Sequence, residues 1–167
     1  MACWERVYLS LGGNVGDRMA NLRAALQALD GTEGVRVTRV SSAYETAPVG
    51  VPDQPAFVNL AVEIETALTP LELLNAVKEI ERRLGRTPTI RWGPREIDID
   101  LVLWGSRVVE TPPLILPHKE FRTRAFMLTP LAEIAPEAVD PVTGMTVRAL
   151  SERPEAQGGV TKLGPFA

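Results

Sequence analysis

Asp98 and Asp100 stand one residue apart at the start of an apolar run, and they are the residues of this chain best placed to hold a metal ion. Side chains alternate between the two faces of a strand, so both carboxylates project from one face, about 6 to 7 Å apart. Ile97, Ile99 and Leu101 project from the other face. An Asp-x-Asp pair can also be a plain solvated face at a sheet edge. The apolar continuation favours a metal site, because like charges near a core are costly unless a cation neutralises them.

A basic loop precedes this pair, and it contributes Arg86, Arg91 and Arg95, with prolines and a glycine that limit its conformations. Such a loop can simply be solvated. Guanidinium groups nevertheless match phosphate oxygens in a forked geometry, and phosphoryl transfer needs positive charge beside its metal ions. The loop and the aspartates together predict divalent metal held against a phosphorylated ligand.

His118 is the sole histidine, and Lys119, Arg122 and Arg124 follow it closely. A lone histidine is often structural, and a catalytic triad has little support because no serine motif accompanies it. The neighbouring cations favour a histidine that faces an anion. Gly12-Gly13-Asn14 lacks the ending of a phosphate-binding loop and the spacing of a dinucleotide fingerprint, so we interpret it as a tight turn.

Three aromatic residues, Phe57, Trp92 and Phe126, have either a core role or a binding role. As core residues they would pack against other apolar side chains and contact no ligand. Aromatic faces near a polar amide such as that of Asn59 could instead clamp a flat heterocycle, with the amide donating and accepting along its edge.

The order of elements indicates how these residues are positioned. We predict strands over residues 6–11, 35–44, 57–66 and 97–104, with a bulge or sharp twist near 38–40. Helices follow at 18–29, capped by Asp17, and at 70–84, where Thr69-Pro70-Leu71-Glu72 has capping-box spacing. A short strand at 108–109 and a helix over 123–134 come later. This order is that of a ferredoxin-like α+β sandwich, whose two helices cover one face of an antiparallel sheet and leave the other for a ligand.

Length and composition bound the class of protein. The 167 residues fit a single domain, 1–167, in which the polar, glycine-rich residues 154–167 form a loosely held C-terminal tail. A charged fraction of 23% and a net charge of −3 argue against a general nucleic-acid or membrane-surface binder. Cys3 is the only cysteine, which rules out a disulfide framework and favours a reducing compartment. We find neither a signal peptide nor a membrane-spanning run, and therefore expect a cytoplasmic protein.

Over about residues 5 to 150 the chain closely resembles 6-hydroxymethyl-7,8-dihydropterin pyrophosphokinase of the folate pathway. The most specific matching motif is Arg91-Trp92-Gly93-Pro94-Arg95 followed by Asp98 and Asp100. Further matching pieces, in family order, are Leu11 to Asp17, Tyr44 to Gly50, Asp53 to Pro55, Phe57, Asn59, Gly85-Arg86, Pro117-His118, Arg124 to Leu128 and Pro130-Leu131.

The resemblance implies transfer of pyrophosphate from the co-substrate ATP to the hydroxymethyl group of the pterin, with release of AMP. Asp98 and Asp100 would ligate Mg²⁺, with two ions expected. Catalysis would involve these two aspartates together with Arg86 and Arg95. ATP would contact Glu81, Arg86, Trp92, Arg95, His118 and Arg124, while the role of Leu101 is left open. The pterin would lie between Phe57 and Phe126, with its edge and remaining surface contacted by Thr46, Ala47, Val49, Asn59 and Trp92.

The resemblance also implies that segments 46–55 and 86–93 are long, mobile catalytic loops, and that the partners are the two small substrates of an enzyme expected to be monomeric. Three departures stand out: Pro88 replaces a second basic residue, Phe57 replaces a common tyrosine, and Lys119 follows His118 where relatives often have proline or tyrosine.

Two alternatives remain open at this point, a metal-dependent phosphodiesterase that uses the same aspartates and a non-enzymatic ferredoxin-like binding module.

Overall fold

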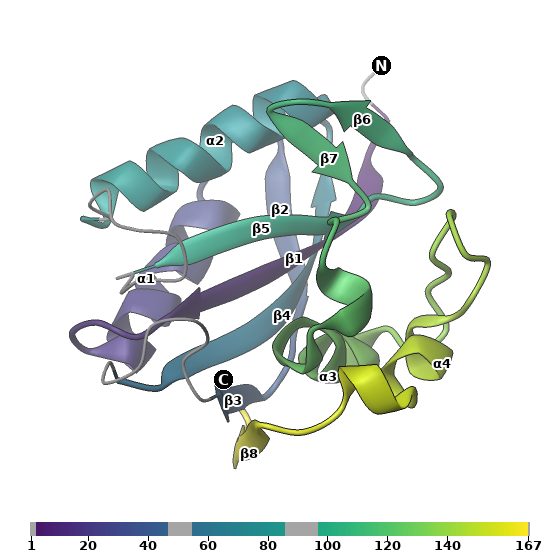
Figure 1. The fold of residues 1–167 in the computed structure, drawn as a ribbon. Helices are drawn as coiled ribbons and strands as arrows, with labels where there is room; N and C mark the ends of the chain where they lie inside the picture. The colour runs from purple at the N-terminus through teal and green to yellow at the C-terminus, as the bar shows by residue number, and fades with distance from the viewer. Residues whose placement is uncertain (1–2, 47–54, 86–96, 167) are drawn as a thin grey trace.

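A six-stranded antiparallel sheet forms the centre of the computed structural model, which describes residues 3–46, 55–85 and 97–166 (Figure 1). Five of its strands follow the order β5-β1-β4-β3-β8, and β2 also pairs with β4. The strands are β1 (Glu5–Gly13), β2 (Val35–Val40), β3 (Ala43–Thr46), β4 (Phe57–Thr66), β5 (Asp98–Leu103) and β8 (Val160–Gly164). A separate hairpin pairs β6 (Val109–Thr111) with β7 (Leu114–Leu116).

The helices are α1 (Arg18–Asp30), α2 (Pro70–Arg83), α3 (Ala125–Ile134) and α4 (Val147–Ser151), with 3₁₀ turns η1 (Phe121–Thr123) and η2 (Pro154–Ala156). Both early helices begin where their capping residues predict. Asp17 accepts a hydrogen bond from the backbone N–H of Ala20, and Thr69 and Glu72 form a reciprocal capping box at α2. Within the described residues no helix is long and apolar enough to cross a bilayer.

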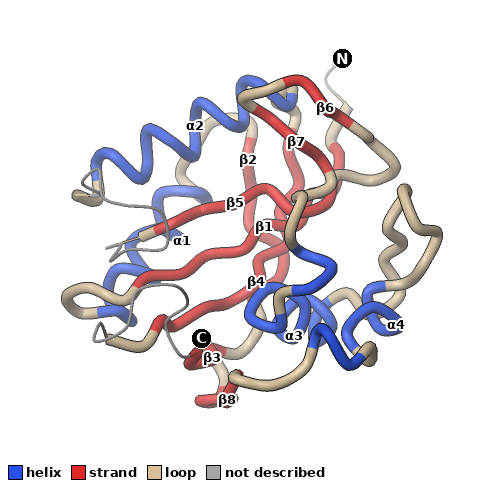
Figure 2. Tube along the Cα trace, viewed as in Figure 1, coloured by secondary structure: helices blue, strands red, loops and turns tan. Residues whose placement is uncertain are grey.

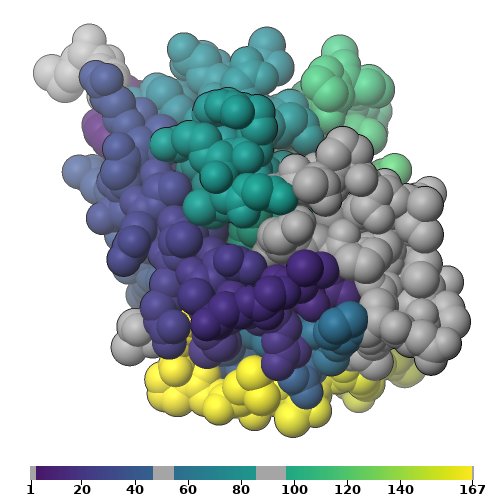
Figure 3. All heavy atoms as spheres, turned by 90° about the vertical axis from the view of Figure 1, so that its left-hand side faces the viewer, coloured from purple at the N-terminus to yellow at the C-terminus, as the bar shows by residue number. Residues whose placement is uncertain are grey.

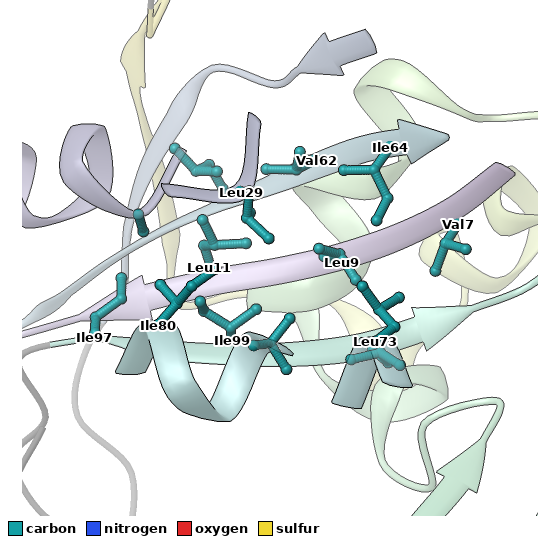
Figure 4. Packing of buried hydrophobic residues seen from close by; sticks show 14 of the residues in the cluster. Val7, Leu9, Leu11, Leu29, Val62, Ile64, Leu73, Ile80, Ile97 and Ile99 are labelled. Atoms are coloured by element: carbon teal, nitrogen blue, oxygen red, sulfur yellow. The ribbon is translucent and has the colours of Figure 1, made fainter. Parts of the chain in front are cut away.

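One face of the sheet packs against α1 and α2, as the sequence predicts. Figure 4 shows Leu9 and Leu11 of β1 directed toward this helical layer, where Leu73 and Ile80 of α2 meet Ile99 of β5. These side chains alternate along their strands with residues of the other face, so the period of two selects the core. The strand–helix–strand–strand–helix–strand order of the sandwich is confirmed.

The opposite face is partly covered by later helices, which corrects the expectation that this whole face is left for a ligand. Tyr8, Ala61 and Val102 form a second buried cluster there with Met127 and Leu128 of α3 and with residues of α4. Figure 2 shows helices on both sides of the strands. The late helix is apolar on most of its surface, and such a helix needs cover from more than one neighbour. The space left for the predicted ligand on this side is therefore limited to the part that α3 and α4 do not cover.

The second predicted strand is two strands. A register shift between Val37 and Arg39 confirms the bulge, and Ser41 and Ser42 then separate β2 from β3. Ser41 fills the break, because its backbone N–H donates to the carbonyl of Ala61 and its hydroxyl accepts from the N–H of the same residue. Both β2 and β3 therefore remain attached to β4.

The C-terminal segment is held in place, so the prediction of a loosely held tail is wrong. β8 pairs with β3 through partners such as Tyr44 and Lys162. Phe166 is buried in the first core cluster, and the guanidinium of Arg23 lies 5.4 Å from its ring centroid. The polar composition of the segment gave no sign of this attachment, because one buried ring and a row of backbone hydrogen bonds suffice to anchor a short strand. Figure 1 shows the C-terminus beside β3.

We expect Phe166→Ala to lower the free energy of unfolding by roughly 2 to 4 kcal/mol, because it removes a buried ring. Leu163→Ala, on β8 and half exposed, should change it by less than about 0.5 kcal/mol. Urea unfolding monitored by circular dichroism measures both. Equal, small effects would show that the tail contributes no packing.

Candidate active site

The register of three neighbouring strands gathers the candidate residues at one end of the sheet. Gly12 of β1 lies opposite Asn59 of β4 on one side and opposite Asp98 of β5 on the other. Two residues before Gly12 on β1, Ser10 lies opposite Asp100. Partners in an antiparallel pair point to the same face. The aspartates and the amide therefore share the face on which α3 packs.

The alternation predicted for the aspartate strand is confirmed. Ile97, Ile99 and Leu101 are at most 5% exposed and lie in the first core, whereas Asp98 and Asp100 are half-buried. The two carboxylates therefore point away from the core toward the site face. Sequence alone left open a solvated edge, and β5 is indeed an edge strand of the main sheet.

The outer edge of β5 is covered by two groups that fix its backbone. The carboxylate of Glu81, 4% exposed on α2, accepts a hydrogen bond of 2.7 Å from the N–H of Ile99. The N–H of His118 donates to the carbonyl of Val102 at 2.9 Å. Sequence reasoning placed Glu81 on the nucleotide side and missed this backbone contact. A carboxylate on the apolar side of an amphipathic helix was the signal, because such a group needs a buried donor.

His118 is a neutral hydrogen-bond donor in this setting. Its Nδ1 accepts from the backbone N–H of Glu120 at 3.1 Å, which leaves the ring proton on Nε2. Burial lowers the pKa of His118, and the charges of Glu120 and Asp98 only partly oppose this shift. The backbone bond to Val102 also attaches His118 to the strand that carries the aspartate pair. A neutral imidazole can donate from Nε2 to an anionic oxygen.

Arg124 and Phe126 lie at the start of α3, the helix that packs on the same face of the sheet as the aspartates. Arg124 immediately precedes the helix, and its Nη2 lies 3.6 Å from a carboxylate oxygen of Glu120. Phe126 is half-buried beside the second core. Both therefore depend on where the first turn of α3 lies.

Glu133 secures the other end of α3 to the sheet. Its carboxylate accepts hydrogen bonds from the backbone N–H and hydroxyl of Ser42 and from the hydroxyl of Tyr44. Burial alone would raise its pKa, but these donors and Lys162 together lower the pKa of Glu133 and keep it ionised. The helix that carries Phe126 is thereby tied to β3.

Asn59 lies across the backbone of β1. Its Nδ2 donates to the hydroxyl of Thr46 at 2.8 Å, and Thr46 is the register partner of Phe57. A Cβ added to Gly12 would lie 2.1 Å from Oδ1 of Asn59, far inside van der Waals contact. Gly12 is thus required by the close approach of a side chain, a role that the tight-turn interpretation missed.

The structure brings Thr46, Phe57, Asn59, Asp98 and Asp100 to one face, with Glu81, His118, Arg124 and Phe126 on adjoining elements. The other predicted site residues, Ala47, Val49, Arg86, Trp92 and Arg95, lie outside the described residues, as do Pro88 and the parts 47–54 and 86–93 of the two predicted loops. The roles of the loop arginines, and the effect of having Pro88 in place of a second basic residue, therefore stay predictions.

The described residues alone would not complete a metal coordination shell, so metal binding would also depend on oxygen atoms of the bound substrate. Within residues 3–46, 55–85 and 97–166 no cluster of three or more histidine, cysteine or acidic side chains could enclose an ion. Asp98 and Asp100 offer oxygen ligands for only part of a coordination shell. This fits Mg²⁺, which is commonly held by one or two carboxylates, water and substrate phosphates.

Comparison with known proteins gives consistent matches. The family model described as 7,8-dihydro-6-hydroxymethylpterin-pyrophosphokinase (HPPK) matches residues 8–136. The chain is 51% identical over 127 residues to 2-amino-4-hydroxy-6-hydroxymethyldihydropteridine pyrophosphokinase of Bacillus subtilis, covering 76% of each chain. It is 49% identical to the protein of that name from Methylorubrum extorquens, covering 86% of this chain and 89% of the other.

A solved structure of Plasmodium falciparum HPPK-DHPS has the same fold. The TM-score is 0.74 at 16% identity, and the match covers 96% of this chain but 47% of that longer one. This likeness supports the α+β sandwich with its antiparallel sheet and packed helices.

We expect Gly12→Ala to lower the free energy of unfolding by about 1 to 3 kcal/mol, because the new methyl group displaces Asn59 and breaks its hydrogen bond to Thr46. In an Asn59→Ala background the same change should cost much less. Urea unfolding of the four proteins in this double-mutant cycle measures the coupling. Additive costs would show that Gly12 is needed for another reason.

Because the chain has a single histidine, one imidazole resonance reports on His118. In magnesium-free buffer we expect it to titrate below the ordinary pKa of about 6.5. The fold favours the neutral ring, so its stability contribution is complete above pH 6.5 or so and is lost as pH falls through the lowered pKa. His118→Gln should lose less stability than wild type over that window. A midpoint at or above the ordinary value would contradict this account.

Proposed function

We propose that this chain, which belongs to the 7,8-dihydro-6-hydroxymethylpterin-pyrophosphokinase family, carries out its reaction with the aspartate pair of β5 and an aromatic pair contributed by β4 and α3. The reaction transfers pyrophosphate from ATP to the hydroxymethyl group of 6-hydroxymethyl-7,8-dihydropterin in folate synthesis. The protein is therefore an enzyme, and the alternatives of a binding module and a phosphodiesterase are wrong. AMP is the second product, because the two outer phosphates leave together.

Asp98 and Asp100 are the proposed Mg²⁺ ligands, and two ions are expected. Support comes from their shared face, their partial exposure and the fixed backbone of β5. Bound Mg²⁺ would supply positive charge that stabilises the attacking hydroxymethyl oxygen of the pterin and the phosphate oxygen that leaves with AMP. Glu81 holds the N–H between the two aspartates, so α2 sets the position of both carboxylates.

The proposed phosphate contacts are made by donors around the aspartates. His118 donates from Nε2 to a phosphate oxygen, and Arg124 places its guanidinium at the start of α3. Arg86 and Arg95 add charge that offsets the developing negative charge, and Trp92 covers the nucleotide. Glu81 remains a proposed residue of the ATP side.

The proposed pterin site lies between Phe57 and Phe126, one on the sheet and one on α3. Asn59 reads the edge of the heterocycle, with Thr46, Ala47 and Val49 beside it and Trp92 closing over it. The row Asn59–Gly12–Asp98 supports this proposal, because only the glycine position of β1 separates Asn59 from the first proposed metal ligand. Such proximity lets positioning contribute most of the catalysis.

We further propose that residues 1–167 form a single domain that acts as a monomer in the cytoplasm. One continuous sheet and two clusters packed on its faces support the single domain. Light scattering after size exclusion tests the monomer.

Purified protein given ATP, Mg²⁺ and 6-hydroxymethyl-7,8-dihydropterin should release one AMP for each pterin consumed. Chromatography of the nucleotides distinguishes AMP from ADP. Release of ADP, or hydrolysis of ATP that does not depend on the pterin, would rule out pyrophosphoryl transfer.

Asp98→Asn and Asp100→Asn should each lower turnover at least a hundredfold or so, since each removes a charged metal ligand. Circular dichroism should show an intact fold, because neither side chain lies in a core cluster. Glu110→Gln, an exposed change on the separate hairpin, is the control. An aspartate variant with near-normal turnover would exclude that residue from metal binding.

A further inference from the structure

Arg18 contacts both strands that carry the proposed pterin residues, from the side of the sheet opposite the proposed ligand. It is the first residue of α1, and its Nη1 lies 3.0 Å from a carboxylate oxygen of Glu45 on β3. The same nitrogen donates to the carbonyl of Ala56 at 2.8 Å, immediately before β4. One guanidinium therefore connects the end of β3 to the beginning of β4.

A second contact from the same turn holds the neighbouring peptide. Asn14, 1% exposed, donates from Nδ2 to the carbonyl of Pro55 at 2.9 Å. Two successive carbonyls before Phe57 are thus fixed by the segment that follows β1. Figure 3 shows this segment, in dark purple, lying against the start of β4 at the surface of this end of the molecule.

These contacts lie on the side of the sheet opposite the proposed ligand. Glu45 pairs with Val58, which belongs to the first core, whereas Phe57 and Asn59 point to the other face. The carbonyl of Ala56 belongs to the peptide group that ends at the nitrogen of Phe57. Any change in its position rotates or shifts the aromatic ring, although Arg18 itself does not face the substrate.

We propose that Arg18 is a positioning residue for the pterin: it holds the peptide before Phe57 and thereby sets the distance between the aromatic pair and the aspartates on the far side of β1. This inference rests on the proposed pterin role of Phe57. Both partners of the ion pair are partly exposed, with side-chain exposures of 31% and 40%. Such pairs contribute little to global stability. The effect of Arg18 on substrate geometry is therefore separable from its effect on folding.

Arg18→Ala tests the proposal through a split between the two substrates. We expect the Kd for 6-hydroxymethyl-7,8-dihydropterin, measured by calorimetry, to rise about tenfold. The Kd for a non-hydrolysable ATP analogue with Mg²⁺ should stay within about twofold, and Tm within about 3 °C. Arg36→Ala is the matched control, because Arg36 forms a partly exposed ion pair of similar length with Glu65, between the paired strands β2 and β4 and away from the proposed pterin site.

Two further variants separate the contacts of Arg18. Glu45→Gln removes the ion pair but leaves the bond to Ala56, so it should raise the pterin Kd less than Arg18→Ala does. Arg18→Lys, which keeps one charged donor, should restore part of the affinity. Unchanged pterin affinity in Arg18→Ala, or equal weakening of both substrates, would overturn the proposal.

Phe57→Ala separates failure of this inference from failure of the site assignment. If Phe57→Ala weakens pterin binding while Arg18→Ala does not, the aromatic site stands and the positioning role is wrong. If Phe57→Ala leaves pterin binding unchanged, the pterin site itself is misplaced and the inference falls with it.

Discussion

The antiparallel pairing of β1 with β4 on one side and β5 on the other is the constraint on which the site depends. Register partners share a face, so this pairing alone brings Asn59, Gly12 and Asp98 into one row. A slip of one residue would turn Asp98 and Asp100 into the core and bring Ile99 to the ligand side. The apolar residues of β1, β4 and β5 prevent that slip, because their burial is lost with it. Core packing and substrate geometry are therefore specified by the same alternation.

Local patterns in the sequence predicted most of what lies near this row. Period-two alternation identified the two faces of β5, and capping residues located the starts of α1 and α2. Each of these signals acts within a few residues of the chain. The arrangement of Phe57 and Asn59 beside the aspartates needed the family resemblance, because no local pattern relates β4 to β5 across β1.

What the sequence did not reveal depends on contacts between distant segments. The cover that α3 and α4 provide for the second face, the anchoring of Phe166 and the contact of Glu81 with Ile99 all join residues far apart in the chain. Glycine at position 12 was interpreted as a turn residue, whereas the approach of Asn59 explains it. Composition misled most at the C-terminus, where polar residues surround a single buried ring.

The irregularity of β5 relates the aspartates to His118. Leu101 pairs with Leu9 and Leu103 with Tyr8, so Val102 is an extra residue between them. In a regular strand its carbonyl would face β1, like that of Asp100; here it points outward and receives the N–H of His118. The bulge also resets the alternation, since Val102 and Leu103 both enter the second cluster. The half of β5 that carries the aspartates and the half that carries Val102 and Leu103 therefore alternate independently, and the bulge lets each half present its own residues to the second face.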